Sequence, residues 1–232
     1  TDGIPFHPYY TVHDIFVVSV FLFIFFAILF FAPEMGGYFL EKPNFEPANA
    51  LKTPLHIAPV WYFTPFYTVL RAIPDPWYGT LAMFAAIIVL FFLPWIDRNP
   101  IKSWRYRTLA HKANLIIFAV VFMVLGWMGV EAVTPAYKEL GTRMTEIYFI
   151  FFVVIGLHSR PASVNYLMWF GILLAVIVGI DLLRYNPDQH EDAAQLIKQF
   201  IWPLAYLAIT LLLPALVKSW NAEKPVPDRV TG

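Results

Sequence analysis

Residues 15–32 read IFVVSVFLFIFFAILFFA, a run in which Ser19 is the single polar side chain. The hydrocarbon core of a bilayer is about 30 Å thick, and about 20 apolar residues in a helix cross it. This run is therefore predicted to be a membrane-spanning helix. Apolar side chains occur on all sides of it, which favours contact with lipid over packing in a soluble bundle.

Five other segments have the same character. They are residues 77–95, 113–130, 144–158, 164–183 and 197–217. The predicted fold class is an all-α integral membrane protein with about six transmembrane helices and a long outer loop that contains an interfacial helix.

The composition agrees with this class and excludes several others. Of the 232 residues, 59% are hydrophobic and 14% are charged, whereas soluble domains average about 45–50% apolar and about 25% charged residues. The net charge is zero, so the chain lacks the basic character of a nucleic-acid-binding protein. It has no cysteine, which excludes disulfides, thiolate-held metals and cysteine nucleophiles within the chain.

Lysines and arginines predict the orientation, because positively charged loops stay on the cytoplasmic side. The basic residues gather in loop 98–112 and in the C-terminal tail, and they are Arg98, Lys102, Arg105, Arg107, Lys112, Lys218, Lys224 and Arg229. Loops 33–76, 131–143 and 184–196 are therefore expected to face outward, with both termini cytoplasmic.

The outer loop 33–76 is too long and too apolar to be a plain connection. Its stretch 51–74, LKTPLHIAPVWYFTPFYTVLRAIP, carries four prolines but few polar residues. Residues 61–70 are predicted to form a short helix along the membrane surface, because exposing so many apolar side chains to water would be costly. Such an aromatic lid suits a flat apolar ring as ligand, and a packed interfacial helix without ligand is the alternative.

Three motifs carry a resemblance to a known family. They are FHPYYTVHD (6–14), NFEPANALKTPLHIAPVWYF (44–63) and LRAIP (70–74). The sequence resembles the C-terminal half of cytochrome b from the quinol–cytochrome c reductase (bc1) complex, and the tail KPVPDRVT (224–231) is similar to that of proteobacterial members. The resemblance implies that two b haems are held by histidine pairs in an N-terminal half that this sequence lacks. The chain is therefore expected to be a split subunit or an excised half.

The positions of the histidines agree with that division. All of them are expected in loops or at helix ends, which is too shallow for haem ligation between facing helices, and they are His7, His13, His56, His111, His158 and His190. No metal ligand is predicted in this chain.

The resemblance implies a quinol-oxidation site on the outer side. Its expected lining residues are Ile57, Pro59, Val60, Trp61, Tyr62, Phe63 and Tyr67. The family has a Pro-Glu-Trp-Tyr motif where this chain has Pro-Val-Trp-Tyr, and the family's glutamate is thought to bind quinol and to carry a proton away. Valine has no titratable group, so this part of the proton route is expected to lie elsewhere.

Quinol oxidation releases two protons, and a nearby base must accept one of them. Candidate bases on the same side are Glu34, Glu46 and Glu131, with Tyr62 and Tyr67 as hydroxyl relays. A base from the absent half, or a purely solvated role for each glutamate, stays open. Arg71 also matches the family pattern, and a structural ion pair or an interfacial anchor is its expected role.

The resemblance also implies a quinone-reduction site on the inner side. Its expected residues are Phe6, His7, Tyr10, His13 and Asp14. Asp14 and His13, together with Tyr62 of the outer site, are the predicted catalytic residues. A carboxyl group can hydrogen-bond a quinone oxygen and, when protonated, deliver a proton to it, and histidine can shuttle protons near neutral pH, although the family often has lysine in place of His13. The alternative for Asp14 is capping of the helix.

The mechanism that the resemblance implies is a proton-translocating Q cycle. Ubiquinol would be oxidised at the outer site, with one electron passing to a Rieske iron–sulfur protein and the other reaching ubiquinone at the inner site through the b haems. Expected partners are the N-terminal half of cytochrome b, the Rieske protein (docking near residues 52–57), cytochrome c1, lipids and a second copy of the complex. Nucleic acid is not an expected partner, and the expected location is the bacterial inner membrane.

Four regions are predicted along the chain. They are a cytoplasmic segment 1–14, a four-helix cytochrome b-like membrane domain 15–158, an extra two-helix membrane segment 159–223 and a cytoplasmic tail 224–232. A lipid-facing or partner-binding role is expected for the extra segment, in which Asp181 and Arg184 could pair across one turn. Glu146 is either a functional intramembrane acid or an interfacial charge.

Two other functional classes stay open. Half of a secondary transporter would need charged or interrupted helices at the midplane, whereas the middles of the predicted helices are almost uniformly apolar. A structural membrane subunit without ligand would not need the sequences at 6–14 and 59–67 together.

Overall fold

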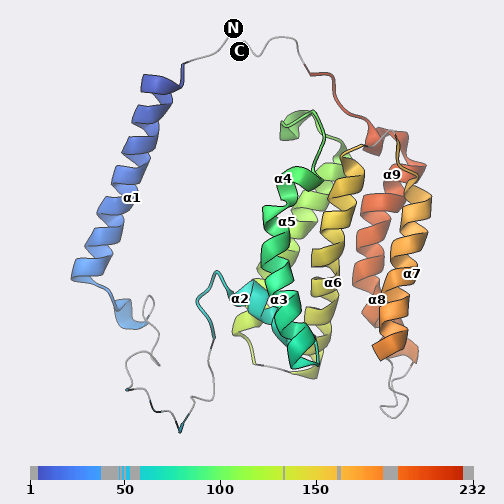
Figure 1. The fold of residues 1–232 in the computed structure, drawn as a ribbon, viewed down its shortest axis with the longest axis horizontal. Helices are drawn as coiled ribbons and strands as arrows, with labels where there is room; N and C mark the ends of the chain where they lie inside the picture. Colours follow the sequence, from blue (N-terminus) through green and yellow to red (C-terminus); the bar gives the residue numbers. More distant parts are fainter. Residues whose placement is uncertain are drawn as a thin grey trace. The chain divides into compact units, whose positions relative to one another are not determined.

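The computed structural model of the chain describes residues 5–37, 47, 49, 51–52, 58–132, 134–160, 163–184 and 193–226. It contains two compact units, one formed by Thr1–Ile57 with Pro227–Gly232 and the other by Ala58–Val226. Every regular element of the described part is helical (Figure 1). The predicted all-α membrane class is confirmed.

One long apolar helix dominates the first unit. A short π-helical turn η1 (Phe6–Tyr10) leads into α1 (Thr11–Phe31), and the 3-10 turn η2 (Met35–Gly37) follows. None of the α1 side chains is buried in the described structure, although nearly all are hydrophobic. Such a helix needs lipid or another protein around it, as the prediction for residues 15–32 requires.

Residues 64–158 form the first helices of the second unit. They are α2 (Thr64–Ala72), α3 (Pro76–Phe91), α4 (Leu93–Ile96), η4 (Trp104–Tyr106), α5 (Leu109–Val130) and α6 (Pro135–His158). Side chains cap the starts of the three longest: Asp75 accepts from the Trp77 and Tyr78 amides, and Thr108 and Thr134 cap α5 and α6. These bonds satisfy amide groups that the first turn of a helix leaves free.

The extra segment adds two further helical hairpin arms. They comprise α7 (Tyr166–Arg184), followed by α8 (Ala193–Leu207), η7 (Ala208–Leu212), α9 (Leu213–Leu216) and η8 (Lys218–Asn221). The run from α8 to α9 is one irregular arm, because Pro203 and Pro214 lack an amide hydrogen and the π-helical turn η7 lies between them. This arm packs beside α6 and α7 (Figure 1).

The predicted spans all correspond to apolar helices. Phe6–Phe31, Leu109–Val130 and Pro135–His158 are long and apolar enough to cross a membrane, and Pro76–Phe91, Tyr166–Leu182 and Phe200–Leu216 are apolar but shorter. The predicted span 77–95 is divided at Phe92, where α3 ends and α4 begins. Pro94 explains the division, because a proline removes a helical hydrogen bond and its ring clashes with the preceding turn.

The prediction of a loop at 131–143 is wrong for most of these residues, because α6 begins at Pro135 rather than at residue 144. Thr134 accepts a hydrogen bond from the Tyr137 amide at 3.2 Å, and proline is favoured at the first position of a helix. The polar residues of this segment suggest a solvated loop. The helix forms nevertheless, because Arg143 is buried and paired rather than solvated.

Arg143 is the centre of an ionic cluster between α6 and α7. Its guanidinium bonds to Asp181 of α7 at 2.6 Å, to Glu146 at 3.0 Å and to Glu139 at 3.1 Å. Its side chain is only 4% exposed, and buried arginines occur in proteins almost only when paired. The side chain of Arg184 lies outside the described part, so its pairing with Asp181 stays a prediction.

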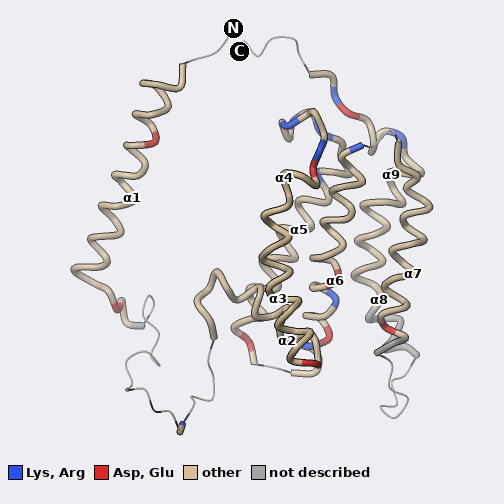
Figure 2. The backbone as a smooth tube through the Cα atoms, in the orientation of Figure 1, with Lys and Arg blue, Asp and Glu red and all other residues tan. Residues whose placement is uncertain are grey.

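The core of the second unit forms where α5 and α6 meet. The Phe118 and Phe151 rings stack with centroids 3.9 Å apart, and the buried Tyr148 hydroxyl donates to the Ala86 carbonyl of α3 at 2.7 Å. We name the two ends of this unit the α2 end and the α4 end, after the helices found there. Charged residues gather toward these ends (Figure 2).

The Arg143→Met variant is expected to lose about 3–5 kcal/mol of stability, because it leaves buried carboxylates without their cation. Thermal unfolding of the purified assembly in detergent measures the loss. Lys138→Met is the matched control, since Lys138 is exposed on the same helix. Equal unfolding temperatures for the two variants would show that the ionic cluster does not hold α6 to α7.

Candidate functional site

An exposed aromatic surface precedes α2. We define the aromatic surface as Val60, Trp61, Tyr62 and Phe63, whose exposed fractions are 52%, 81%, 52% and 48%. Neighbouring rings contact one another, with centroids 5.5 Å apart for Trp61 and Tyr62 and 4.9 Å apart for Tyr62 and Phe63. The structure thus brings together four of the predicted quinol-site residues.

The backbone beneath the aromatic surface is fixed by hydrogen bonds. The Thr64 hydroxyl donates to the Trp61 carbonyl at 2.6 Å, and the Phe63 amide donates to the Val60 carbonyl at 2.8 Å. The Thr68 hydroxyl donates to the Leu125 carbonyl of α5 at 2.7 Å. Side chains therefore join the turn to α2 and α2 to α5.

Two glycines allow α2 to lie unusually close to its neighbours. A Cβ atom at Gly129 of α5 would lie 2.4 Å from the Thr64 carbonyl oxygen, and one at Gly79 of α3 would lie 2.6 Å from the Leu70 carbonyl oxygen. Real Cβ atoms essentially never show such distances. The positions of α2 and of the aromatic surface thus depend on the absence of these side chains.

Arg71 anchors the other end of α2. Its guanidinium donates to the Met128 carbonyl at 2.7 Å and to the Glu131 carbonyl at 3.3 Å, and it lies 4.9 Å from the centre of the Tyr67 ring. These carbonyls end α5, where a helix leaves acceptors without partners. Arg71 therefore acts as an anchor through backbone carbonyls, and Tyr67 beside it is half-buried.

The helix predicted along the membrane surface at 61–70 exists, but it is displaced and buried. Residues 61–63 form a turn, and α2 itself buries Thr64, Pro65, Phe66, Thr68, Val69 and Ala72 among α3, α5 and α6. Of the other predicted lining residues, Pro59 is half-buried and Ile57 lies outside the described residues.

The candidate bases differ in their surroundings. Glu131 is half-buried at the end of α5, Glu34 is exposed in the first unit, and Glu46 lies outside the described residues. Glu146 is not an interfacial exposed charge, because its side chain is 10% exposed and bound to Arg143.

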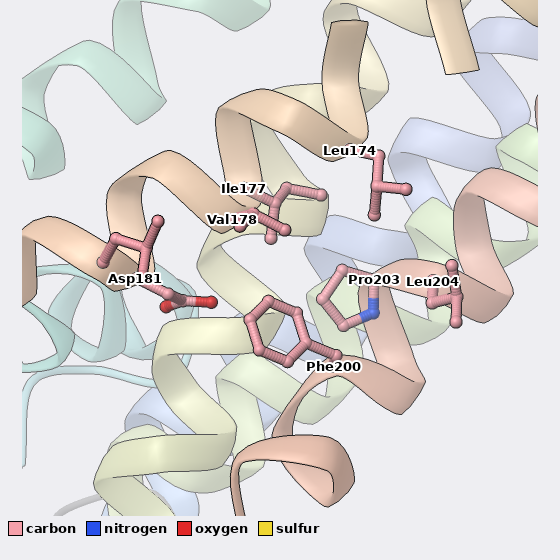
Figure 3. A pocket seen from close by; sticks show the side chains of 8 residues that line it. Leu174, Ile177, Val178, Asp181, Phe200, Pro203 and Leu204 are labelled. Carbon is pink, nitrogen blue, oxygen red and sulfur yellow. The ribbon is translucent and has the colours of Figure 1, made fainter. Parts of the chain in front are cut away.

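Two apolar cavities flank α7, and neither was predicted from the sequence. One, of about 780 Å³, lies between the α2–α3 turn, α6 and α7, with Tyr78, Thr145 and Glu146 in its wall. The other, of about 510 Å³, lies between α7 and α8, where Asp181 lies beside Phe200 (Figure 3). Their linings come from helices far apart in the sequence, so no local pattern marks them.

The predicted inner-site residues form a local cluster in the first unit. The Phe6 and Tyr10 rings stack with centroids 5.9 Å apart, and the His7 Nδ1 lies 3.3 Å from the Thr11 hydroxyl. The His13 Nδ1 lies 2.7 Å from the Tyr9 carbonyl oxygen. This bond fixes the His13 ring against the preceding turn, and its other nitrogen is available to a ligand.

Asp14 does not cap α1. Tyr10 occupies the capping position without a side-chain bond, and Asp14 lies in the first turn with an exposed side chain. A carboxylate in a first helical turn is favoured by the helix dipole. The capping alternative is therefore wrong, and the Asp14 carboxylate can contact a ligand.

A buried polar cluster at the α4 end was missed by the sequence analysis. The Tyr206 hydroxyl donates to the Asn114 side-chain oxygen at 2.6 Å, and the His158 Nε2 lies 3.0 Å from the Thr210 carbonyl oxygen. His111 is also buried, with its ring centroid 6.4 Å from that of His158. His111 is thus buried beside His158 of α6 rather than solvated at a helix end.

These histidines do not fit a haem. A haem between two histidines needs a nitrogen of each ring directed at one iron atom, whereas the His111 and His158 rings meet edge to face and His158 Nε2 contacts a carbonyl. Within the described ranges, no group of three or more His, Asp or Glu side chains could hold a metal ion. His56 and His190 lie outside those ranges.

Asp97 and Arg107 form an ion pair near the start of α5, with 2.5 Å between Oδ2 and the guanidinium. Burial raises the pKa of the Asp97 carboxyl, but the hydrogen bond and the charge of Arg107 lower it by more, so the pKa lies below its ordinary value. Asp97 is therefore ionised at neutral pH, and its carboxylate is bound to Arg107.

Known proteins resemble part of this chain. A sequence-family model described as "Cytochrome b(C-terminal)/b6/petD" matches residues 47–149. The chain is 53% identical over 163 residues to cytochrome b of Allochromatium vinosum, an alignment that covers 68% of this chain and 39% of that protein. It is 44% identical over 154 residues to cytochrome b of Rhodospirillum rubrum, with 66% and 37% covered.

A solved structure agrees with these relatives. A chain of a "Hyperthermophilic respiratory Complex III" superposes with a TM-score of 0.59 at 39% identity, covering 67% of this chain and 38% of that chain. The chain thus spans about two fifths of the length of the curated relatives it matches. The aromatic surface, α2 and most of α6 lie inside the matched residues, and this part of the chain therefore belongs to the C-terminal cytochrome b family.

Proposed function

We propose that this chain is the C-terminal part of cytochrome b in a bc1-type quinol–cytochrome c reductase and forms parts of two quinone sites. The observation that carries the proposal is the aromatic surface, which stays exposed although it is held firmly by α2. Exposed rings on a fixed backbone can receive a flat quinol ring without a further cost of ordering. Aromatic pairs contribute about 0.5–1.5 kcal/mol beyond the burial of their area.

At the quinol-oxidation site, side chains of this chain would contact the quinol ring and accept a proton from it. Trp61 and Tyr62 offer a ring face and a hydroxyl, and the Tyr67 hydroxyl and Glu131 are the acceptors close to α2. Oxidation of ubiquinol to ubiquinone releases two electrons and two protons. One proton would leave through these groups, since Val60 cannot accept it.

At the quinone-reduction site, Asp14 and His13 would donate protons to the quinone oxygens, and Phe6, His7 and Tyr10 would contact the ring. The exposed Asp14 carboxylate and the bonded His13 ring support these roles. The b haems of the assembly would be held by another part of the protein, because the described residues of this chain do not fit them.

The complex extends beyond this chain. Its proposed components are the N-terminal half of cytochrome b, a Rieske iron–sulfur protein docking near residues 52–57, cytochrome c1 and a second copy of the whole. We place it in the bacterial inner membrane, with the α4 end cytoplasmic and the α2 end outward, because the basic loop 98–112 lies at the α4 end. The quinol-oxidation site would then face outward.

The Val60→Glu variant tests whether the aromatic surface is solvated or covered by apolar protein. Val60 is 52% exposed, so glutamate should keep contact with water and change stability by less than about 0.5 kcal/mol. The amount of assembled complex and its unfolding temperature measure this, with Val60→Gln as the uncharged control. Loss of assembly in the glutamate variant alone would mean that the pocket is built differently.

The Asp14→Ala variant should slow quinone reduction by about 100-fold, at the lower end of what a positioned acid contributes. Electron entry from quinol should be unchanged, because Asp14 belongs to the other proposed site. Stopped-flow reduction of the b haems through each route separates the two steps. Equal slowing of both routes would contradict the assignment and indicate a folding defect.

The Gly129→Ala variant should displace α2 and lower quinol-dependent cytochrome c reduction by up to about 100-fold, since small displacements of a positioned group are costly to rate. Gly126→Ala is the matched control, because its Cβ would lie 3.5 Å from its nearest neighbour, Pro65. Activity is measured per assembled complex. Equal activities in the two variants would show that the position of α2 does not govern quinol oxidation.

A further inference from the structure

A groove at the α4 end combines two arginines with exposed aromatic rings. It has a volume of about 400 Å³ and lies between α4 and the end of α6. Arg98 and Arg160 contribute the charges, and Phe92 and Trp95 contribute the rings. Gly156 of α6 lies against Ile96, where a Cβ would be 3.4 Å from the Ile96 Cγ2 atom.

The walls of the groove are tied together by Ser159. Its hydroxyl donates to the Ile96 carbonyl at 3.0 Å and accepts from the Arg98 amide at 3.1 Å. The Arg98 Nε donates to the Trp95 carbonyl at 2.9 Å. The stem of Arg98 is thus held in place beside Trp95, while its terminal nitrogens make no hydrogen bond to the described residues.

The two arginines have no acidic partner among the described residues. The adjacent carboxylate, Asp97, is engaged by Arg107, and Glu223 accepts from the Asn99 amide group at 2.7 Å. Arg98 and Arg160 are both exposed. The groove therefore presents two cations that lack a counter-ion within the described chain.

The order of side chains along the groove matches the order of groups in a phospholipid. Phe92 and Trp95 are 55% and 65% exposed next to the apolar helices α3 and α6, and the arginines follow where the helices end. Tryptophan is enriched at the level of lipid headgroups. Basic pockets between transmembrane helices bind anionic headgroups, and arginine binds phosphate with paired hydrogen bonds.

We propose that this groove binds one anionic phospholipid, with its phosphate between Arg98 and Arg160 and its acyl chains over Phe92 and Trp95. The groove contains none of the residues assigned to the two quinone sites, and the proposal does not depend on the proposed function. An acyl chain is required in addition to the phosphate, because the exposed rings of Phe92 and Trp95 line the groove beside the arginines.

The test compares lipid retention by the assembled complex after delipidation in detergent. Native mass spectrometry counts bound phosphatidylglycerol, phosphatidylcholine or inorganic phosphate after each is added at equal concentration. The double variant Arg98→Gln/Arg160→Gln is expected to bind phosphatidylglycerol about tenfold or more weakly than wild type. The control Lys102→Gln/Arg105→Gln removes two exposed cations from the neighbouring loop and should bind as wild type does.

The single variant Arg160→Gln covers the case in which the double variant fails to assemble. Its side chain is exposed and makes no hydrogen bond to the described residues, so the change should weaken phosphatidylglycerol binding without affecting assembly. Undiminished binding in both groove variants would overturn the proposal. An equal loss of phosphatidylcholine, or full displacement by inorganic phosphate, would also overturn it, because the site would then select hydrocarbon or free anion.

Discussion

The structure depends on one constraint: within a membrane, a backbone carbonyl without a hydrogen-bond partner is costly. Side chains meet this requirement at four places where a helix ends or is deformed. Arg71 bonds the last carbonyls of α5, Thr68 bonds the Leu125 carbonyl, and Ser159 bonds the Ile96 carbonyl. His158 contacts the Thr210 carbonyl in the π-helical turn η7. These bonds hold irregular chain inside the bundle, and the same bonds fix the elements that carry the proposed sites.

The position of the aromatic surface is a consequence of this constraint. Arg71 and Thr68 bond α2 to α5, and Thr64 of α2 lies against Gly129. The buried face of α2 is therefore already packed against its neighbours. The rings just before α2 therefore cannot turn inward and stay exposed. Exposed apolar rings that are held in a fixed position commonly mark a binding site. The Val60 side chain adds apolar surface beside the rings, and its backbone carbonyl accepts the hydrogen bond from the Phe63 amide.

Much of the fold could be predicted from the sequence, because each membrane helix is marked by its own local run of apolar residues. The start of α6 could not, since Arg143 looks like a loop residue until its partner Asp181, 38 residues away, is known. The burial of His158 was missed for the same reason, because Thr210, whose carbonyl it contacts, lies 52 residues later in the chain. The candidate site residues came from the resemblance of short motifs, whereas the groove and cavities arise from side chains that only the fold brings together.

Photolabelling of the assembled complex would determine whether the aromatic surface contacts the quinol ring, as we propose. An azido-substituted ubiquinol would be irradiated with the active complex, and the labelled peptides identified by mass spectrometry. We expect label on the peptide that contains Trp61, Tyr62 and Tyr67, and protection of that peptide by excess ubiquinol. Protectable label confined to other peptides of an active complex, with none on this stretch, would contradict it.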